Sequence, residues 1–158
     1  MARAYLEADN DYSFQNVTFA EQGRAIVGMA SGFTAEQRRG FSDRPLTPAA
    51  GFPAFRLAAL RLLCAPLFRI LETLAEGDFY LLAIAVDPEV RGAGVGSVLM
   101  DLMEDRARSG GSTRLSLDVA AKNERARRLY ERRGMSVESK WPRPPFLPAL
   151  FVRMAKPL

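Results

Sequence analysis

The stretch that decides the fold is FYLLAIAVDPEVRGAGVGSVLM, residues 79–100. Its first eight residues are an uninterrupted apolar run that ends at Asp87-Pro88, which predicts a central strand buried on both faces. A glycine cluster follows, and the sequence after it predicts a helix that ends near Gly110. The apolar stripe of this helix consists of Val98, Leu99, Leu102 and Met103. The order is therefore strand, glycine turn, helix.

The glycine turn itself indicates an anion site. Missing side chains let several backbone N–H groups approach an anion at a helix N-terminus, where the peptide dipoles favour negative charge, and a diphosphate suits such a site. Gly92, Gly94 and Gly96 alternate, which does not match G-x-G-x-x-G, and no Gly-Lys-Ser/Thr follows. These departures argue against dinucleotide-binding and P-loop sites. A tight turn without a ligand is the alternative.

The next segment predicts a second strand and a second helix. In TRLSLDVA, residues 113–120, Leu115, Leu117 and Val119 alternate, so that Ser116 and Asp118 share the opposite face. Asp118 is then the strand's single carboxylate. Asn123 is a suitable N-cap for a helix that ends at Gly134. The inward face of that helix would carry Ala126, Leu129, Tyr130 and Arg133.

The remaining segments complete a mixed α/β sheet in one domain, residues 1–158. A hairpin is predicted from Asn16 with its turn at Gly23, and two short strands are predicted over residues 135–140 and 151–155. Residues 34–53 are rich in Gly, Pro and polar side chains, which predicts a mobile connection or lid. Residues 57–75 have helical periodicity interrupted by Pro66, so a bent helix or two short helices are expected.

Composition narrows the chemistry. The 158 residues include a single cysteine, Cys64, and no histidine. An intramolecular disulfide, histidine-based nucleophilic machinery and histidine-ligated metals are therefore excluded, and no metal site is predicted. Proton transfer must use Asp, Glu, Tyr, Lys, Cys or water. The longest apolar tract, residues 57–71, is too short and too charged to span a membrane, and no secretory signal is visible, so a cytoplasmic location is expected.

The positive charge is concentrated in one segment. The net charge is +4, and residues 122–133, KNERARRLYERR, hold six basic and two acidic side chains. The rest of the chain is therefore balanced. A local basic excess favours an anionic ligand over a general nucleic-acid surface, with a solvated helix face as the alternative.

Two motifs lie in order along this half of the chain: Asp87-Pro88-x-x-Arg91-x-x-Gly94-x-Gly96 and Asn123-x-x-Ala126-x-x-Leu129-Tyr130-x-x-x-Gly134. Together they resemble the GNAT superfamily of N-acetyltransferases, and most closely its ribosomal-protein alanine N-acetyltransferase type. The resemblance implies the GNAT acyl-CoA N-acyltransferase fold, a central mixed β-sheet flanked by helices. It also implies acetyl-CoA as co-substrate and an amine as acceptor.

The resemblance further implies where acetyl-CoA would bind. Backbone groups of Ile84, Ala85 and Val86 would bond its pantetheine arm as an added strand does. Asn123 and Ala126 would lie near the thioester or the arm, and one or more of Arg127, Arg128, Arg132 and Arg133 would meet the 3′-phosphate. The diphosphate would be held by the backbone amides of Arg91, Gly92, Ala93, Gly94, Val95, Gly96 and Ser97.

For catalysis, the matching tyrosine of the family protonates the departing thiolate of CoA, and here that residue is Tyr130. The ribosomal-protein type places a basic carboxylate on the preceding strand, where this chain has Asp118. Aspartate is shorter than glutamate, so a water would be needed to reach the acceptor. The alternatives are a hydrogen-bonding role for Asp118 at the strand end and a water chain as base.

The sequence also departs from the family pattern. The first strand and much of the first helix that usually precede the hairpin are expected to be absent or shortened, which leaves a sheet edge open to homodimer formation. The apolar, proline-rich residues 141–148 would suit a hydrophobic amine or a peptide N-terminus. Two other functions are considered: a non-catalytic acyl-CoA-binding module, and a nucleic-acid-binding domain that uses the basic face of residues 125–133. No membrane or nucleic-acid partner is expected.

Overall fold

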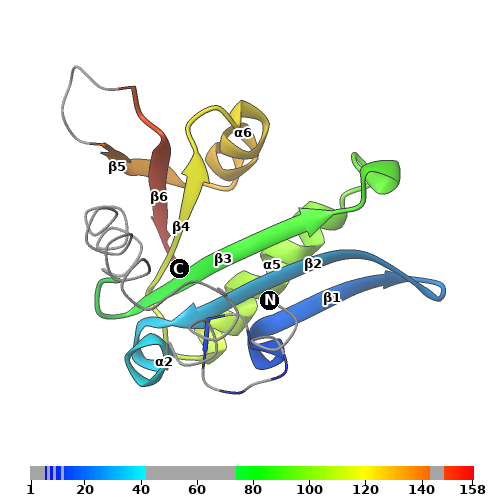
Figure 1. Cartoon of the computed structure of the whole chain (residues 1–158), viewed down its shortest axis with the longest axis horizontal. Helices are drawn as coiled ribbons and strands as arrows, with labels where there is room; N and C mark the ends of the chain where they lie inside the picture. Colours follow the sequence, from blue (N-terminus) through cyan, green and yellow to red (C-terminus); the bar gives the residue numbers. More distant parts are fainter. Residues whose placement is uncertain (1–5, 7, 9, 12, 42–73, 143–147) are drawn as a thin grey trace, which may run out of the picture.

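The computed structural model describes the chain except for residues 1–5, 7, 9, 12, 42–73 and 143–147. The described residues form a six-stranded sheet in the order β1-β2-β3-β4-β6-β5 (Figure 1). The strands are β1 (Val17–Gln22), β2 (Ala25–Thr34), β3 (Asp78–Val86), β4 (Arg114–Ala120), β5 (Ser136–Trp141) and β6 (Phe151–Pro157). The helices are α2 (Ala35–Gly40), α5 (Val95–Ser109) and α6 (Glu124–Arg132), with 3₁₀ turns η1 (Phe14–Asn16) and η2 (Pro88–Val90).

The predicted mixed sheet is confirmed. β3 and β4 are parallel, and the other neighbouring strands are antiparallel. The hairpin of β1 and β2 turns at Gly23, whose φ of 65° lies in the left-handed region that favours glycine. Among the described residues β1 forms one edge of the sheet, and strand pairing at that edge between two copies remains a prediction.

The sheet splits between its two parallel strands. β3 and β4 are paired from Asp78 and Arg114 as far as Leu81 and Leu117, and they then diverge (Figure 1). Beyond the split, and within the described ranges, β3 stays paired only with β2, and β4 only with β6. The prediction that residues 79–86 are buried on both faces is therefore wrong for their second half. Residues 78–81 are buried, whereas residues 82–86 are partly or fully exposed because the neighbouring strand has moved away.

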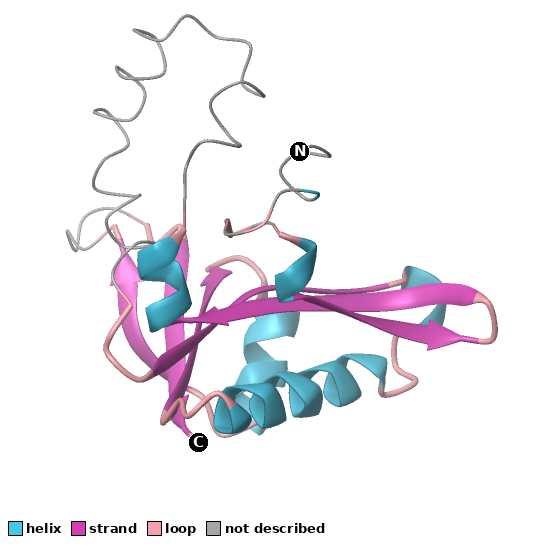
Figure 2. Ribbon diagram, turned by 90° about the horizontal axis from the view of Figure 1, so that it is seen from below, coloured by secondary structure: helices cyan, strands magenta, loops and turns pink. Residues whose placement is uncertain are grey.

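Helix α5 covers one face of the sheet (Figure 2). Its buried apolar side chains are Leu99, Met100, Met103 and Ala107, and they pack with Phe79, Leu81, Leu115 and Leu117. The predicted stripe is only half correct, because Val98 is 55% and Leu102 43% exposed. Apolar residues cover more of this helix than the sheet can bury, so periodicity alone did not select the face that contacts the strands.

The predicted connection over residues 34–53 is wrong at its beginning. Residues 35–40 form α2, which starts with a capping box in which Thr34 and Gln37 exchange bonds of 2.9 and 3.0 Å. Residues 42–53 lie outside the described part of the chain, and so does the helix predicted over residues 57–75, apart from residues 74 and 75, which are not helical. None of the helices in the described ranges is long and apolar enough to cross a membrane.

Candidate active site

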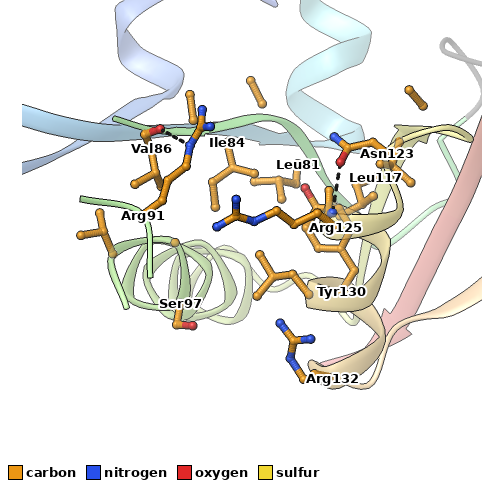
Figure 3. A pocket seen from close by; sticks show the side chains of 18 of the residues that line it. Leu81, Ile84, Val86, Arg91, Ser97, Leu117, Asn123, Arg125, Tyr130 and Arg132 are labelled. Atoms are coloured by element: carbon orange, nitrogen blue, oxygen red, sulfur yellow. Dashed lines mark hydrogen bonds between the residues drawn. The ribbon is translucent and has the colours of Figure 1, made fainter. Parts of the chain in front are cut away.

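A cavity of about 770 Å³ opens where β3 and β4 separate (Figure 3). Its walls are the second half of β3, the glycine turn with the start of α5, the end of β4, and α6. All but one of the predicted cofactor-binding residues line this cavity: Ile84, Ala85, Val86, Arg91, Gly92, Gly94, Val95, Gly96, Ser97, Asn123, Ala126, Tyr130 and Arg132. The exception is Ala93. Segments up to 48 residues apart in the sequence thus meet at one site.

The glycine turn leaves backbone donors at the start of α5. Gly92 and Gly94 have φ angles of 93° and 86°, which other residues adopt only with strain. Three amides in the turn are already used, because those of Arg91, Ala93 and Ser97 donate to carbonyls of the turn itself. Within the described residues, by contrast, no acceptor binds the amides of Gly92, Gly94, Val95 and Gly96. Fewer backbone amides are therefore available to an anion than the predicted run from residue 91 to residue 97.

Arg91 closes this turn against the strand before it. Its Nε donates to the carbonyl oxygen of Val86 over 3.3 Å (Figure 3). The preceding turn η2 is held by Asp87, whose Oδ1 accepts from the amide of Glu89 at 2.9 Å. The arginine of the first motif thus fixes the position of the glycine turn relative to the end of β3.

Three arginines in or directly after α6 are engaged in contacts with other residues. Arg128 bonds Glu124 at 3.0 Å, Arg127 lies 3.9 Å from Glu131, and Arg133 bonds Asp101 at 2.6 Å and the carbonyl of Ser97. The bond to Arg133 lowers the pKa of Asp101.

Only two arginines of α6 line the cavity, Arg125 and Arg132, and neither has an ion pair or side-chain hydrogen bond within the described residues. Of the four arginines predicted for the 3′-phosphate, Arg132 alone reaches the cavity. Sequence reasoning missed Arg125 as a candidate. Arg125 and Arg132 are seven residues apart, and this spacing puts both side chains on one face of the helix.

Asn123 begins α6 as predicted. Its Oδ1 accepts from the amide of Ala126 at 3.1 Å, which confirms the N-cap and sets the first turn of the helix beside the cavity (Figure 3). The helix ends before Gly134, whose φ is 81°.

Tyr130 combines a buried ring with a place in the cavity wall. It is 6% exposed and packs in the main apolar core. Burial raises the pKa of its phenol, since the charged phenolate would lose its hydration. The phenol therefore carries its proton at neutral pH, as a general acid must.

Asp118 also lines the cavity, but it is tightly held. Its Oδ1 accepts from Nε of Arg153 at 3.1 Å, and its Oδ2 accepts from Nη2 of Arg153 at 2.6 Å and from the hydroxyl of Tyr80 at 3.0 Å. Burial and the charge of Asp118 raise the pKa of Tyr80. Sequence reasoning missed this network, although a lone arginine between Val152 and Met154 in a buried strand is a signal for a buried acidic partner.

Taken together, the described walls of the cavity carry free backbone amides, two arginines without a bonded partner and a buried tyrosine. Among the described residues no group of three or more His, Cys, Asp or Glu side chains is placed to hold a metal ion. The free amides come from the glycine turn and the start of α5, the two arginines come from α6, and the edge of β3 over residues 82–86 forms a third wall.

Comparison with known proteins assigns this fold to a family. Residues 2–135 match the model of the acetyltransferase (GNAT) family. A crystal structure described as an acetyltransferase superposes with a TM-score of 0.67 at 24% identity, covering 99% of this chain and 77% of that chain. The ribosomal-protein-alanine N-acetyltransferase from Brucella melitensis superposes with a TM-score of 0.54 at 21% identity, covering 90% of this chain and 68% of that chain.

A mycothiol acetyltransferase matches a shorter part of this chain. The mycothiol acetyltransferase of Beutenbergia cavernae is 42% identical over 62 residues, which is 39% of this chain and only 20% of that protein. Since the family model covers most of the sequence, the chain belongs to the GNAT acetyltransferase family. The sheet and its flanking helices confirm the predicted fold class.

Proposed function

We propose that this protein is an N-acetyltransferase that transfers the acetyl group of acetyl-CoA to a primary amine of a small molecule or a peptide. The observation that carries the proposal is the cavity at the split between β3 and β4, where free amides, unpaired arginines and Tyr130 meet. Members of the GNAT family generally use acetyl-CoA as donor.

The described residues fit that co-substrate. The amides of Gly92, Gly94, Val95 and Gly96, which have no acceptor within the described chain, would hold the diphosphate at the start of α5. The edge of β3 over residues 82–86 has no strand partner on the β4 side, so its backbone groups would bond the amides of the pantetheine arm. Arg132 would meet the 3′-phosphate.

The proposed reaction is a direct transfer. When bound, acetyl-CoA supplies a thioester whose carbonyl carbon is attacked by the nitrogen of the acceptor. As the new C–N bond forms, the C–S bond breaks, and Tyr130 gives its phenolic proton to the departing sulfur. The nitrogen loses one proton to a base, and a proton returns to Tyr130, so the products are an amide and CoA.

Asp118 is our candidate for the base, with a water between it and the acceptor. A carboxylate offers about four lone-pair sites, and Arg153 and Tyr80 use three of them. The fourth remains for a water in the cavity that Asp118 lines. A purely positioning role of the same network is the competing interpretation, and the variants discussed below separate the two.

The proposal is tested first by calorimetric titration with acetyl-CoA and with CoA, followed by a thiol-release assay on a panel of amines, amino acids and short peptides. We expect micromolar binding of both nucleotides and release of CoA with at least one acceptor. The variant Arg91→Ala should bind more weakly, because the turn would lose its tie to Val86. Wild-type protein that binds neither nucleotide would overturn the proposal. Tight binding without turnover on any acceptor would favour the non-catalytic acyl-CoA-binding module.

A further inference from the structure

We propose that Arg125 binds the diphosphate of the co-substrate from the wall of the cavity opposite the glycine turn. The inference rests on the proposed function and deepens it, because it assigns a second, side-chain half to the anion site. The first half consists of the backbone amides at the start of α5, whereas Arg125 comes from the first turn of α6. The diphosphate would then be held between two helices.

Position supports this assignment. Arg125 lies two residues after the N-cap Asn123 and lines the cavity together with the glycine turn. Figure 3 shows its side chain reaching from α6 into the cavity toward the side where Arg91 and the start of α5 lie. The Arg125 guanidinium and the glycine turn thus lie on different walls of the cavity, with the space for an extended ligand between them.

Elimination of the other cations supports it as well. Among the described residues three arginines line the cavity: Arg91, Arg125 and Arg132. Arg91 is bonded through Nε to the carbonyl of Val86. Arg132 lies on the last turn of α6, seven residues after Arg125, and the proposed function assigns it to the 3′-phosphate. Arg125 is therefore the remaining cavity-lining arginine, with no bonded donor within the described residues and no role assigned above.

The local charge balance favours an anion at this place. In the part of the chain that the structure describes, Asp118 is the one carboxylate that lines the cavity, and Arg153 bonds it as an ion pair. An anion beside the turn would thus meet the positive end of α5 and the Arg125 guanidinium, and no other carboxylate of the described residues lines the cavity. Arginine presents its donors in a planar fork that can bond two oxygens of a phosphate at once.

Arg128 provides a matched control for this position. It lies on the same helix, is also exposed and carries the same charge, but it bonds Glu124 and does not line the cavity. A loss of binding in Arg125→Ala that is absent in Arg128→Ala therefore reports the site rather than the net charge of the helix.

The experiment measures the affinities of wild type, Arg125→Ala and Arg128→Ala for CoA, 3′-dephospho-CoA and pantetheine by calorimetry. One charge-assisted contact corresponds to about a tenfold to hundredfold change in affinity. We expect Arg125→Ala to lose that factor equally for CoA and dephospho-CoA and to bind pantetheine as wild type does. The salt dependence of dephospho-CoA binding should also weaken. Arg128→Ala should match wild type with all three probes.

Three results would overturn the inference, and they differ from one another. Affinities of Arg125→Ala within twofold of wild type for both nucleotides would show that the side chain makes no contact. A loss for CoA with none for dephospho-CoA would move Arg125 to the 3′-phosphate. Wild type that binds no CoA would remove the proposed function and this inference with it. Circular dichroism checks the fold of each variant, and Arg125→Gln replaces the alanine variant if the latter does not fold.

Discussion

Arg153 and Asp118 face each other directly in the register between β6 and β4, and they are joined by two hydrogen bonds of 3.1 and 2.6 Å. Their side chains are only 9% and 4% exposed. The hydroxyl of Tyr80 adds a third bond from β3. Three neighbouring strands are thus connected on one face of the sheet by a buried charge pair at the edge of the candidate site.

Replacing Asp118 should therefore cost stability as well as activity. Asp118→Asn keeps the shape of the side chain but removes the negative charge that two hydrogen bonds join to the buried Arg153 guanidinium. Breaking a buried pair in this way costs about 3–5 kcal/mol. We expect the free energy of unfolding from urea titrations to fall by an amount in that range.

A second replacement separates structure from catalysis at this position. Adding Arg153→Met to Asp118→Asn also removes the buried guanidinium, so the double variant should recover most of the lost stability. If Asp118 is the base, acetyl transfer by the double variant stays low despite its recovered stability. Recovery of turnover together with stability would assign Asp118 a positioning role only.

Tyr130→Phe tests the proposed general acid. The substitution removes one oxygen from a buried ring and leaves the packing in the core intact. General acid catalysis contributes about a hundredfold to ten-thousandfold in rate, so kcat should fall by that factor while the affinity for CoA stays within about twofold of wild type. Steady-state kinetics and calorimetry on the same preparation measure both quantities.

The comparison variant for Tyr130 is Val98→Ala, which shortens an exposed side chain on α5 outside the cavity. It should retain the kcat of wild type. A Tyr130→Phe enzyme that also retains it would show that another group or water protonates the leaving thiolate.

The sequence predicted the strand, glycine turn and helix of residues 79–100, because these depend on local features: an apolar run, glycines and helical spacing. The N-cap Asn123 was predictable for the same reason. The split between β3 and β4 was not predictable from residue patterns, since residues 82–86 are as apolar as the buried half of the strand. Long-range pairing decides which half loses its neighbour.

Charge partners were predicted least well. Arg128 and Glu124 are four residues apart on α6, a spacing that predicts their contact. Arg133, by contrast, pairs with Asp101 on another helix, α5. That contact withdraws Arg133 from the candidate phosphate ligands and leaves Arg132 and Arg125. Which arginine stays unpaired depends on how α5 and α6 pack together, and a single sequence does not contain that information in local form.

Gly32 is a packing requirement of the sheet. A Cβ atom built there would lie 2.4 Å from Cε1 of Phe79 and 2.8 Å from the backbone oxygen of Tyr80. Because a buried ring and a backbone atom would both have to move, Gly32→Ala should lower the free energy of unfolding by about 1–3 kcal/mol. Gly40→Ala, which meets nothing within 4 Å, should leave it nearly unchanged. Thermal denaturation of the two variants measures the contrast, and equal melting temperatures would contradict it.

Tyr80 should make the stability of the protein sensitive to alkaline pH. Burial and the charge of Asp118 raise the pKa of its phenol above the value of about 10 that it has in the unfolded chain. At pH values above 10 the unfolded state therefore loses its phenolic proton while the folded state still holds it. Stability from this group is complete below pH 10 and is lost as the pH rises toward the folded-state pKa.

Tyr80→Phe isolates this contribution, since it removes the titrating group and keeps the ring. At neutral pH the variant should be less stable than wild type by about 1 kcal/mol, the typical net value of a hydrogen bond. The difference should shrink as the pH rises above 10, because only wild type loses stability through Tyr80. Urea titrations at several pH values between 7 and 11 measure it. A difference that stays constant over this range would mean that the Tyr80 phenol titrates alike in the folded and unfolded chains.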